Sequence, residues 1–242
     1  MTTISLSIII PAYNEGPRIV KTLETVSGYL SRQPYSWEIV VVNDGSNDDT
    51  ADRLRGMLPK IPQLFWSNHQ KNYGKGAAVR TGLHQARGER ILIYDADGAT
   101  PIEEIEKCFE PLKNGAQIVS GSRRMAGAAV EIDQRRIRRI LGAGYRRLCR
   151  FFVTPGISDI TCGFKMVTQN ARDILVPRMR VRGWSFDAEI FVIARQHRLT
   201  IIEIPVRWAD QHKTKVRLGR DLLASFFELI GILLRKIVGT YR

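Results

Sequence analysis

The feature of this sequence that most constrains its fold is a regular alternation between short apolar runs and longer segments with helical periodicity. The apolar runs are rich in β-branched residues and end at polar or glycine residues; they span residues 6–10, 39–42, 63–66, 91–94 and 118–119. Such runs are typical of strands covered on both faces. Helix-like segments separate them, at residues 16–30, 48–57, 76–87 and 102–112. The alternation predicts an α/β fold in which helices flank a mostly parallel, Rossmann-like sheet.

The charged residues are distributed unevenly along the chain. Residues 1–120 contain 13 Lys and Arg against 14 Asp and Glu, whereas residues 121–242 contain 24 against 10, so the net charge of +13 comes from the second half. A composition of 44% hydrophobic and 25% charged residues excludes a disordered or low-complexity chain. The basic half predicts an anionic partner, which leaves nucleic acid, a membrane surface and a phosphorylated substrate open.

The cysteines and the hydropathy pattern bear on the compartment. Cys108, Cys149 and Cys162 are scattered without a CxxC pattern, which favours a reducing compartment over a disulfide framework. The chain enters its first apolar run without the basic segment of a signal peptide, and no run has the roughly 18–20 apolar residues of a membrane span. We therefore expect no signal peptide and no transmembrane segment, and a protein on the cytoplasmic side of any membrane that it contacts.

Two segments of the second half have the pattern of amphipathic helices. Residues 135–152 carry seven arginines and no acid, and their apolar residues recur at helical spacing. Residues 219–242 repeat the apolar pattern, which Glu228, Arg235 and Lys236 interrupt. Packing on the core is the ordinary role of such helices, but two wide apolar faces flanked by Arg and Lys favour an interfacial position on an anionic membrane.

Asp95-Ala96-Asp97 follows the apolar run 91–94 directly. Just past the end of a strand, the two carboxylates can converge on one hard cation, and such oxygen ligands suit Mg²⁺ or Mn²⁺ bound to phosphate oxygens. Alone, a pair with this spacing is also typical of a solvated turn or a helix cap, and Asp97-Gly98 favours a turn. The metal interpretation therefore depends on the neighbouring segments.

Polar segments also follow the other predicted strands, at residues 11–15, 43–50 and 72–77. Each has a structural interpretation, as a strand end, an N-capping loop and a glycine turn. The glycine turn, which contains Lys75, also suits a phosphate bound by backbone N–H groups, although it is neither a Walker loop nor a GxGxxG motif. Because ligands bind outside the carboxyl ends of parallel strands, we expect these segments to converge.

Taken together and in this order, these segments resemble those of family 2 glycosyltransferases, which have the GT-A fold. The resemblance to the nucleotide-sugar half of that family lies at residues 11–15, 44–46, 74–77 and 95–97. Residues 121–123, 159–165, 186–189 and 214–215 resemble the subgroup that transfers hexoses to polyprenyl or dolichyl phosphates. Residues 95–100 are more similar to the glucose-transferring branch of that subgroup than to the mannose-transferring branch.

The resemblance implies roles for individual residues. The residues implied in nucleotide-sugar binding are Pro11, Tyr13, Glu15, Asp44, Lys75 and Asp95. The residues implied in catalysis are Asp97, Arg123, Arg136 and Lys215. Asp95 and Asp97 would hold Mg²⁺ or Mn²⁺ on the diphosphate of the donor. Arg123 and a later basic residue, Arg136 or Lys215, would contact the acceptor phosphate.

The implied reaction moves a hexose, with inversion, from a nucleoside diphosphate to a polyprenyl or dolichyl phosphate. UDP-glucose is the favoured donor and GDP-mannose the alternative. A phosphate oxygen is already ionised at neutral pH, so it needs orientation and a counter-charge from arginine rather than a strong general base. One catalytic domain would span residues 1–242, with a nucleotide-sugar and metal half (1–120), an acceptor half (121–218) and a C-terminal amphipathic helix (219–242). Attachment to an anionic membrane would be peripheral, directly or through a separate membrane protein.

Several expectations concern single residues. Ala99 stands where some members of the family have an oxygen ligand, so water or a rearranged Asp95 would complete the metal's coordination. Trp184 and Trp208 are expected to be packing residues, and Trp208 is also a candidate for lining the acceptor site. The four histidines show no metal-ligand spacing and receive no role.

Other functions remain compatible with the sequence. A nucleic-acid-binding protein would use the arginines of residues 135–152, but the apolar face of that helix and the acidic residues 95–97 count against it. The intact carboxylates disfavour an inactive adaptor, and a family 2 enzyme with a hydroxyl acceptor would need a carboxylate base. Asp187 and Glu189 are interpreted first as acids at a helix N-terminus, ahead of a direct catalytic role or of support for an arginine or lysine. Asp159 is interpreted as a structural partner.

Overall fold

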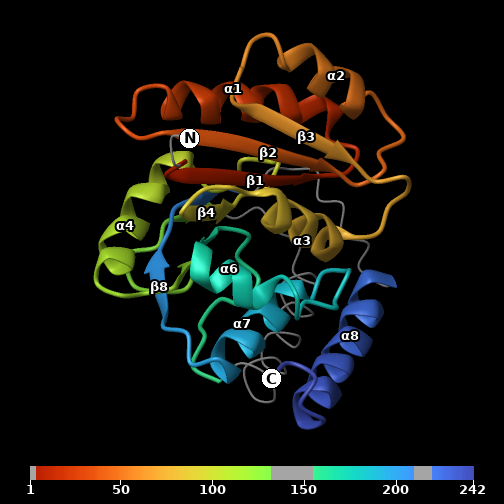
Figure 1. Cartoon of the computed structure of the whole chain (residues 1–242), viewed down its shortest axis with the longest axis vertical. Helices are drawn as coiled ribbons and strands as arrows, with labels where there is room; N and C mark the ends of the chain where they lie inside the picture. Colours follow the sequence, from red (N-terminus) through yellow and green to blue (C-terminus); the bar gives the residue numbers. More distant parts are fainter. Residues whose placement is uncertain (1–3, 132–154, 210–219) are drawn as a thin grey trace.

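The structure is a computed structural model that describes residues 4–131, 155–209 and 220–242 (Figure 1). Its centre is a seven-stranded sheet with the order β3-β2-β1-β4-β7-β5-β8. The strands are β1 (Leu6–Ala12), β2 (Trp37–Asn43), β3 (Leu64–Asn68), β4 (Arg90–Ile93), β5 (Ile118–Ser122), β7 (Lys165–Thr168) and β8 (Ile201–Pro205). A separate pair joins β6 (Val130–Glu131) to β9 (Trp208–Ala209). The strands predicted from the five apolar runs are confirmed.

All residues of strand β1 are buried, as is typical of a strand that lies inside the sheet and is covered on both faces. It pairs in parallel with β2 and β4, and β2 pairs in parallel with β3. Among the seven strands of this sheet, β7 alone runs antiparallel to its neighbours β4 and β5, while β5 and β8 are parallel. The mostly parallel sheet is confirmed. Strands β1 to β4 therefore end at one edge, where their polar loops meet.

Helices cover both faces of this sheet, as the alternation predicted (Figure 1). On one face lie α1 (Gly16–Leu30), α2 (Thr50–Met57), the 3₁₀ helix η1 (Ile102–Ile105) and α4 (Glu106–Lys113). On the other face lie α3 (Lys75–Gln85), α6 (Gln169–Leu175), α7 (Phe186–Gln196) and α8 (Arg220–Ile237). Strand β1 supplies both cores by alternation, since Ile8 and Ile10 join the first and Ile9 the second.

Strand β7 is one of the elements that the sequence analysis did not predict; β6, β8, β9 and α6 are others. Strand β7 inserts between β4 and β5, far from its neighbours in sequence, and it begins at the buried Lys165. A four-residue strand that starts with a charged residue has no clear apolar run. Its position matters for function, because the residues just before it are brought beside the end of β4.

Helix α8 is amphipathic, as predicted, but with two apolar faces. Leu229 and Ile232 are buried in the same core as the apolar residues of α7. The opposite side exposes seven large apolar residues, namely Leu223, Phe226, Phe227, Ile230, Leu234, Ile237 and Val238. We call these seven residues the apolar stripe. No helix within the described ranges is both long enough and apolar enough to span a membrane.

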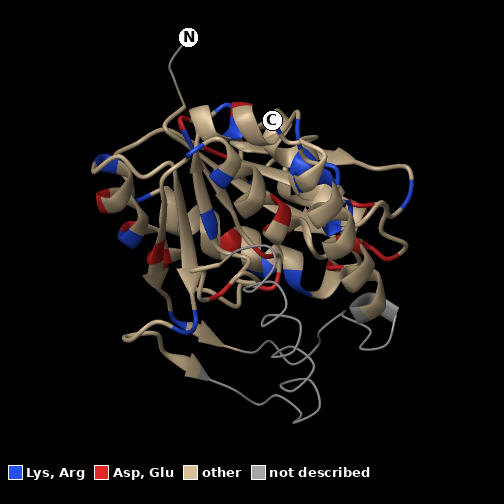
Figure 2. Ribbon diagram, turned by 90° about the horizontal axis from the view of Figure 1, so that it is seen from below, with Lys and Arg blue, Asp and Glu red and all other residues tan. Residues whose placement is uncertain are grey.

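The charge asymmetry of the sequence falls mainly outside the described residues. Ten of the 24 basic residues of the second half lie in residues 132–154 and 210–219, including every arginine of the predicted helix 135–152. In the part of the chain that is described, basic and acidic residues are intermingled (Figure 2). The prediction of an amphipathic helix at 135–152 therefore lies outside the described residues.

Candidate active site

The loops after β1 and β2 are held together by side-chain hydrogen bonds. Asn14, at a positive φ of 54°, accepts from the N–H of Asn47 (2.8 Å), and its own N–H donates to Ser46 Oγ (2.8 Å). Asparagine adopts this left-handed backbone more readily than most residues. Asp48 accepts from the N–H of Gly16 at the start of α1 (3.2 Å). The two polar segments predicted to converge are thus in contact, and Asn14 and Asp48 act structurally.

The residues implied in nucleoside binding lie along these loops. Pro11 is buried at the end of β1, and Tyr13 is partly buried just beyond it. Glu15 precedes α1 and forms an ion pair with Arg18 (2.7 Å). Asp44, only 2% exposed, follows β2. These residues share one edge of the sheet, so the arrangement allows them to act on one ligand.

Asp44 organises the loop that leads into α3. Its Oδ1 contacts His69 Nδ1 (2.6 Å) and accepts from the N–H of Tyr73 (3.0 Å), while Oδ2 accepts from the N–H of Gly74 (2.8 Å). His69 Nε2 in turn contacts the Thr81 hydroxyl (3.0 Å). His69 therefore has a definite structural role that its spacing in the sequence did not reveal. The position of His69 directly after β3, at the ligand edge, was the available signal.

The glycine turn before α3 packs against residues 181–185, which we call the tryptophan loop because Trp184 lies within them. The N–H groups of Gly76 and Ala77 donate to the carbonyl oxygens of Gly183 (3.2 Å) and Arg182 (3.1 Å). Both donors at the start of α3 are thus engaged within the protein. The alternative in which these N–H groups bind a phosphate is not supported, and the structural interpretation of the turn is favoured.

Lys75, the first residue of α3, contacts the aspartate pair after β4. Its Nζ lies 2.5 Å from Asp95 Oδ1. Burial disfavours charge on both groups, yet their mutual attraction raises the pKa of Lys75 and lowers the pKa of Asp95. Burial and repulsion by Asp95 raise the pKa of Asp97. The structure thus brings together Lys75, Asp95 and Asp97.

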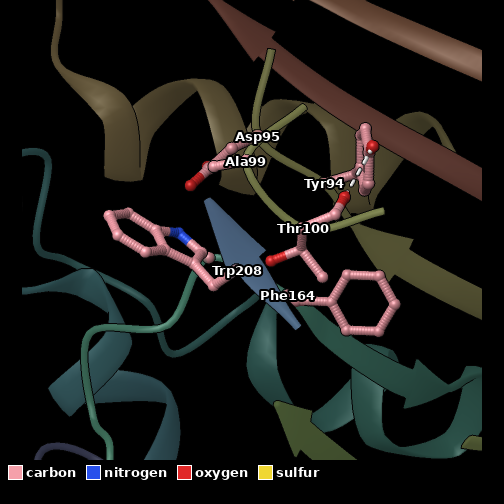
Figure 3. Close-up of a pocket in the computed structure, with 7 residues that line it drawn as sticks. Tyr94, Asp95, Ala99, Thr100, Phe164 and Trp208 are labelled. Atoms are coloured by element: carbon pink, nitrogen blue, oxygen red, sulfur yellow. Dashed lines mark hydrogen bonds between the residues drawn. The ribbon is translucent and has the colours of Figure 1, made fainter. Parts of the chain in front are cut away.

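The segment before β7 packs directly on Asp95. A Cβ atom on Gly163 would lie 2.0 Å from Asp95 Oδ2, so only glycine leaves room for this carboxylate. A small pocket beside it is lined by Tyr94, Asp95, Ala99, Thr100, Gly163, Phe164 and Trp208. In Figure 3, Asp95 and Ala99 lie on one side of this pocket, with Trp208 and Phe164 across from them. Trp208 is thus beside the aspartate pair.

The aspartate pair fits a divalent cation that also binds the donor. Asp97 Oδ1 accepts from the N–H of Ala99 (3.0 Å), which orients the carboxylate. Ala99 itself is buried and offers no side-chain ligand. Within the described residues no group of three or more carboxylate, histidine or cysteine side chains forms a metal cage. Mg²⁺ commonly binds through one or two carboxylates plus substrate phosphates and water, which is the donor set available here.

Arg123 is held in place by Asp159. Its Nε and Nη2 donate to the two carboxylate oxygens (2.7 and 2.9 Å), and Nη2 also donates to Thr161 Oγ1 (3.0 Å). Although burial opposes ionisation, these hydrogen bonds lower the pKa of Asp159 to about 2. The guanidinium carbon lies 5.3 Å from the ring centre of Trp208. Asp159 is therefore the structural partner that was predicted, and Trp208 both contacts Arg123 and lines the pocket at Asp95.

A buried ion pair lies in the same region. Lys165 Nζ lies 2.7 Å from Asp187 Oδ1 and donates to the carbonyl oxygens of Ile160 (3.2 Å) and Cys162. Burial raises the pKa of Asp187 even though Lys165 opposes the shift. Asp187 thus supports a lysine, as one of the predictions stated. Lys165 was missed as a functional residue, although it lies in the segment 159–165 that carried the resemblance.

The remaining predicted residues divide into three groups. Glu189 accepts from the N–H groups of Arg180 and Val181, so it has a structural role. The expectation that Trp184 is an ordinary packing residue is wrong, since 38% of it is exposed and Lys75 Nζ lies 5.6 Å from its ring centre. Arg136 and Lys215 lie outside the described residues.

Several solved structures are similar to this one at low sequence identity. Glucosyl-3-phosphoglycerate synthase from Mycobacterium tuberculosis, in complex with UDP, superposes with a TM-score of 0.67 over 96% of this chain and 80% of its own, at 18% identity. Mannosyl-3-phosphoglycerate synthase from Rubrobacter xylanophilus superposes with a TM-score of 0.69 over 98% and 74%, at 16% identity. These likenesses confirm the expected GT-A fold.

Curated relatives are more similar in sequence. A dolichyl-phosphate beta-glucosyltransferase of Trichomonas vaginalis is 39% identical over 93% of this chain and 70% of its own length. The human dolichyl-phosphate beta-glucosyltransferase is 32% identical over 99% and 78%. The sequence profile described as Glycosyl transferase family 2 matches residues 7–175. With its sheet, its aspartate pair and this match in agreement, the chain belongs to glycosyl transferase family 2.

Proposed function

We propose that this protein transfers glucose, with inversion, from UDP-glucose to dolichyl phosphate or a related polyprenyl phosphate. The observation that carries the proposal is the contact of Lys75 with Asp95, beside Asp97 and Gly163, in a chain similar to dolichyl-phosphate beta-glucosyltransferases. The donor would lie along the edge formed by Pro11, Tyr13, Glu15 and Asp44. Those four residues follow β1 and β2, and the aspartate pair follows β4.

The chemical demand on the donor side is neutralisation of the leaving diphosphate. A divalent cation, Mg²⁺ or Mn²⁺, held by Asp95 and Asp97 would supply Lewis-acid stabilisation of that charge. Lys75 adds a positive charge at the same position. Because Asp44 accepts from the N–H groups of Tyr73 and Gly74 in the loop that precedes Lys75, it also shapes the donor site. Positioning and electrostatic stabilisation are the main contributions expected from these residues.

The chemical demand on the acceptor side is orientation of a phosphate oxygen that is already ionised. Arg123 suits this role, because Asp159 engages Nε and Nη2 and fixes the plane of the guanidinium. Arg136 and Lys215 are proposed as the further cations for the same phosphate. A hydroxyl acceptor would instead need a carboxylate base, whereas Asp159 and Asp187 are each committed to a cation. Because both carboxylates form ion pairs and neither is placed to act as a base, the site favours a phosphate acceptor.

A transfer assay that crosses donors and acceptors tests the proposal. Purified protein is incubated with UDP-glucose or GDP-mannose, and with a short polyprenyl phosphate or its dephosphorylated alcohol, with and without Mg²⁺ or Mn²⁺. The expected result is metal-dependent glucose transfer to the phosphate alone. Transfer of mannose instead of glucose would contradict the proposed donor, and transfer to the alcohol would contradict the proposed phosphate acceptor. If no pair of donor and acceptor gave turnover, the proposal as a whole would be contradicted.

We further propose that one catalytic domain spans residues 1–242 and lies peripherally on the cytoplasmic side of a membrane. Residues 1–120 would serve the donor and 121–218 the acceptor, with 219–242 on the membrane surface. Two observations support this placement: the apolar stripe of α8 is exposed to solvent, and Cys108 and Cys162 are free. An apolar stripe on a helix that also carries Arg235 and Lys236 suits an anionic lipid surface.

Binding to vesicles is expected to depend on the apolar stripe. Replacing Phe227, Leu234 and Ile237 by Gln should weaken binding to anionic vesicles at least about tenfold, because each large apolar side chain contributes roughly 1.5–3 kcal/mol when buried. All three are more than half exposed, at 67%, 57% and 70%, so folding should be unaffected. Co-sedimentation with phosphatidylserine-containing vesicles measures the effect.

A matched control is Phe65→Gln, which removes an equally large apolar side chain that is 46% exposed on β3, at the edge of the sheet. It should bind vesicles like the wild type. Deleting residues 219–242 should also weaken binding, but it removes the buried Leu229, Ile232 and Tyr241 as well. Unchanged binding of the triple variant would show that the stripe does not contact lipid and would favour recruitment by a separate membrane protein.

A further inference from the structure

Helix α8 reaches toward the donor site through one glutamate. The N–H of Gly183 donates to Glu228 Oε1 (2.9 Å), and the N–H of Ser185 donates to Glu228 Oε2 (3.0 Å). The hydroxyl of Ser185 also donates to a backbone carbonyl oxygen of α8 (3.0 Å). Because the two N–H donors flank Trp184, Glu228 holds the backbone on both sides of this indole.

The tryptophan loop that Glu228 holds is packed tightly on the start of α3. A Cβ atom on Gly76 would lie 2.6 Å from the carbonyl oxygen of Val181, and a Cβ atom on Gly183 would lie 2.3 Å from Glu228 Oε1. Both distances are far shorter than a van der Waals contact, so a side chain at Gly76 would displace the backbone of the loop, and one at Gly183 would displace the Glu228 carboxylate. The loop is thus fixed between α8 and the helix that begins with Lys75.

Trp184 is the point at which this loop meets the aspartate pair. The Nζ atom of Lys75 lies 5.6 Å from the centre of the Trp184 ring and 2.5 Å from Asp95 Oδ1. An ammonium within about 6 Å of an indole face is attracted to it. Trp184 is 38% exposed, so it is only partly enclosed by its neighbours, and the backbone of the loop contributes to where the ring lies.

A second anchor fixes the other end of the same loop. Glu189 accepts from the N–H groups of Arg180 (2.9 Å) and Val181 (2.9 Å), and also from the hydroxyl of Tyr241 (2.7 Å). Tyr241 is fully buried just beyond α8. The loop is therefore held near Val181 by Glu189 and the C-terminal residues, and beside Trp184 by Glu228 together with the Ser185 hydroxyl.

We propose that Glu228 is a positioning residue for the donor site: it fixes Trp184, and through Trp184 it fixes the Lys75 ammonium against Asp95. The inference rests on the proposed function in so far as Lys75 and Asp95 are assigned there to the donor. It adds that α8, the helix with the exposed apolar stripe, is connected to the metal-binding pair. Donor binding therefore depends on how α8 is seated.

The test measures Mn²⁺-dependent binding of UDP by calorimetry, together with initial rates of transfer. In Glu228→Gln, one of the two N–H groups faces an amide donor instead of an oxygen, so the loop loses a charged hydrogen bond. The expected result is an increase of about tenfold in the Kd for UDP and in the KM for the donor. The KM for the acceptor and kcat should stay within about twofold of the wild type.

A double-mutant cycle with Lys75→Met shows whether Glu228 acts through Lys75. Lys75→Met alone should weaken UDP binding, and adding Glu228→Gln should then change the Kd by less than about twofold. Trp184→Leu breaks the link from the loop side and should reproduce the Glu228→Gln pattern. Glu24→Gln, which changes an exposed glutamate on α1, is the matched control and should resemble the wild type.

The outcomes separate this inference from the proposed function. If wild-type protein binds UDP and transfers glucose but Glu228→Gln does the same with unchanged constants, the inference is overturned and the function stands. The inference would also be overturned if Glu228→Gln raised the Kd for UDP by the same factor with and without Lys75→Met. It would be overturned as well if Glu228→Gln changed kcat and both KM values by the same factor. If wild-type protein binds no nucleotide at all, the proposed function fails before any variant is compared.

Discussion

Asp97→Asn is expected to lower the rate of sugar transfer by at least about 10³-fold, which corresponds to roughly 4 kcal/mol of transition-state stabilisation. The change removes the negative charge of one of the two carboxylates proposed to bind the metal, while Asn keeps the size of the side chain. The Ala99 N–H can still donate to the amide oxygen, so the loop should keep its shape. Steady-state rates with Mg²⁺ or Mn²⁺, and metal-dependent binding of UDP, measure the loss.

The matched control for this variant is Asp52→Asn, which neutralises an exposed aspartate on α2 that pairs only with Arg55 in the contacts described. An exposed pair of this kind contributes little to stability, so this protein should transfer sugar at the wild-type rate. Full activity of Asp97→Asn would remove the metal pair from the mechanism, and with it the central element of the proposed function.

Gly163→Ala is expected to reduce transfer by about 10²-fold with little loss of stability. The added Cβ would lie 2.0 Å from Asp95 Oδ2 and 2.4 Å from its Cγ, so the carboxylate must move away by more than 1 Å. A displacement of that size at a reacting centre is sufficient for a loss of this order. Asp95 is partly exposed and can swing aside, so the melting temperature should change little.

Gly28→Ala provides the control, because nothing lies within 4 Å of a Cβ atom added at this helical position. Alanine in place of an exposed helical glycine stabilises by roughly 0.5–1 kcal/mol, and activity should be unchanged. If Gly163→Ala retained wild-type activity, then the exact position of the Asp95 carboxylate would not limit the reaction. Loss of folding in Gly163→Ala alone would show that the contact is structural.

Most of the sheet follows from local sequence. The runs that became β1 and β2 are continuously apolar because these strands are buried on both faces, and burial on two faces leaves a pattern that composition alone reveals. Helix α1 begins and ends at the predicted residues for a similar reason, since its buried residues recur at helical spacing. Strand β7 escaped prediction because its pairing with β4 and β5 joins segments that are distant in sequence.

The candidate site divides in the same way. Asp44, Asp95 and Lys75 could be identified because polar residues placed after apolar strands converge in a parallel sheet. The sequence did not reveal that Gly163 lies against Asp95, because that contact depends on the insertion of β7. One interpretation of Asp187 was support for an arginine or lysine, but the identity of that residue as Lys165 became visible only when both were buried together.

The sequence by itself determined the α/β class, the family and the aspartate pair, because each depends on the order and spacing of residues along the chain. Only the tertiary structure decided which polar groups form hydrogen bonds with one another. It assigned the first N–H groups of α3 to the tryptophan loop rather than to a phosphate, and it joined Glu228 to Gly183 across 45 positions. Periodicity reports only whether a residue is buried. Hydrogen bonds between distant segments depend on how the elements pack, which no local pattern records.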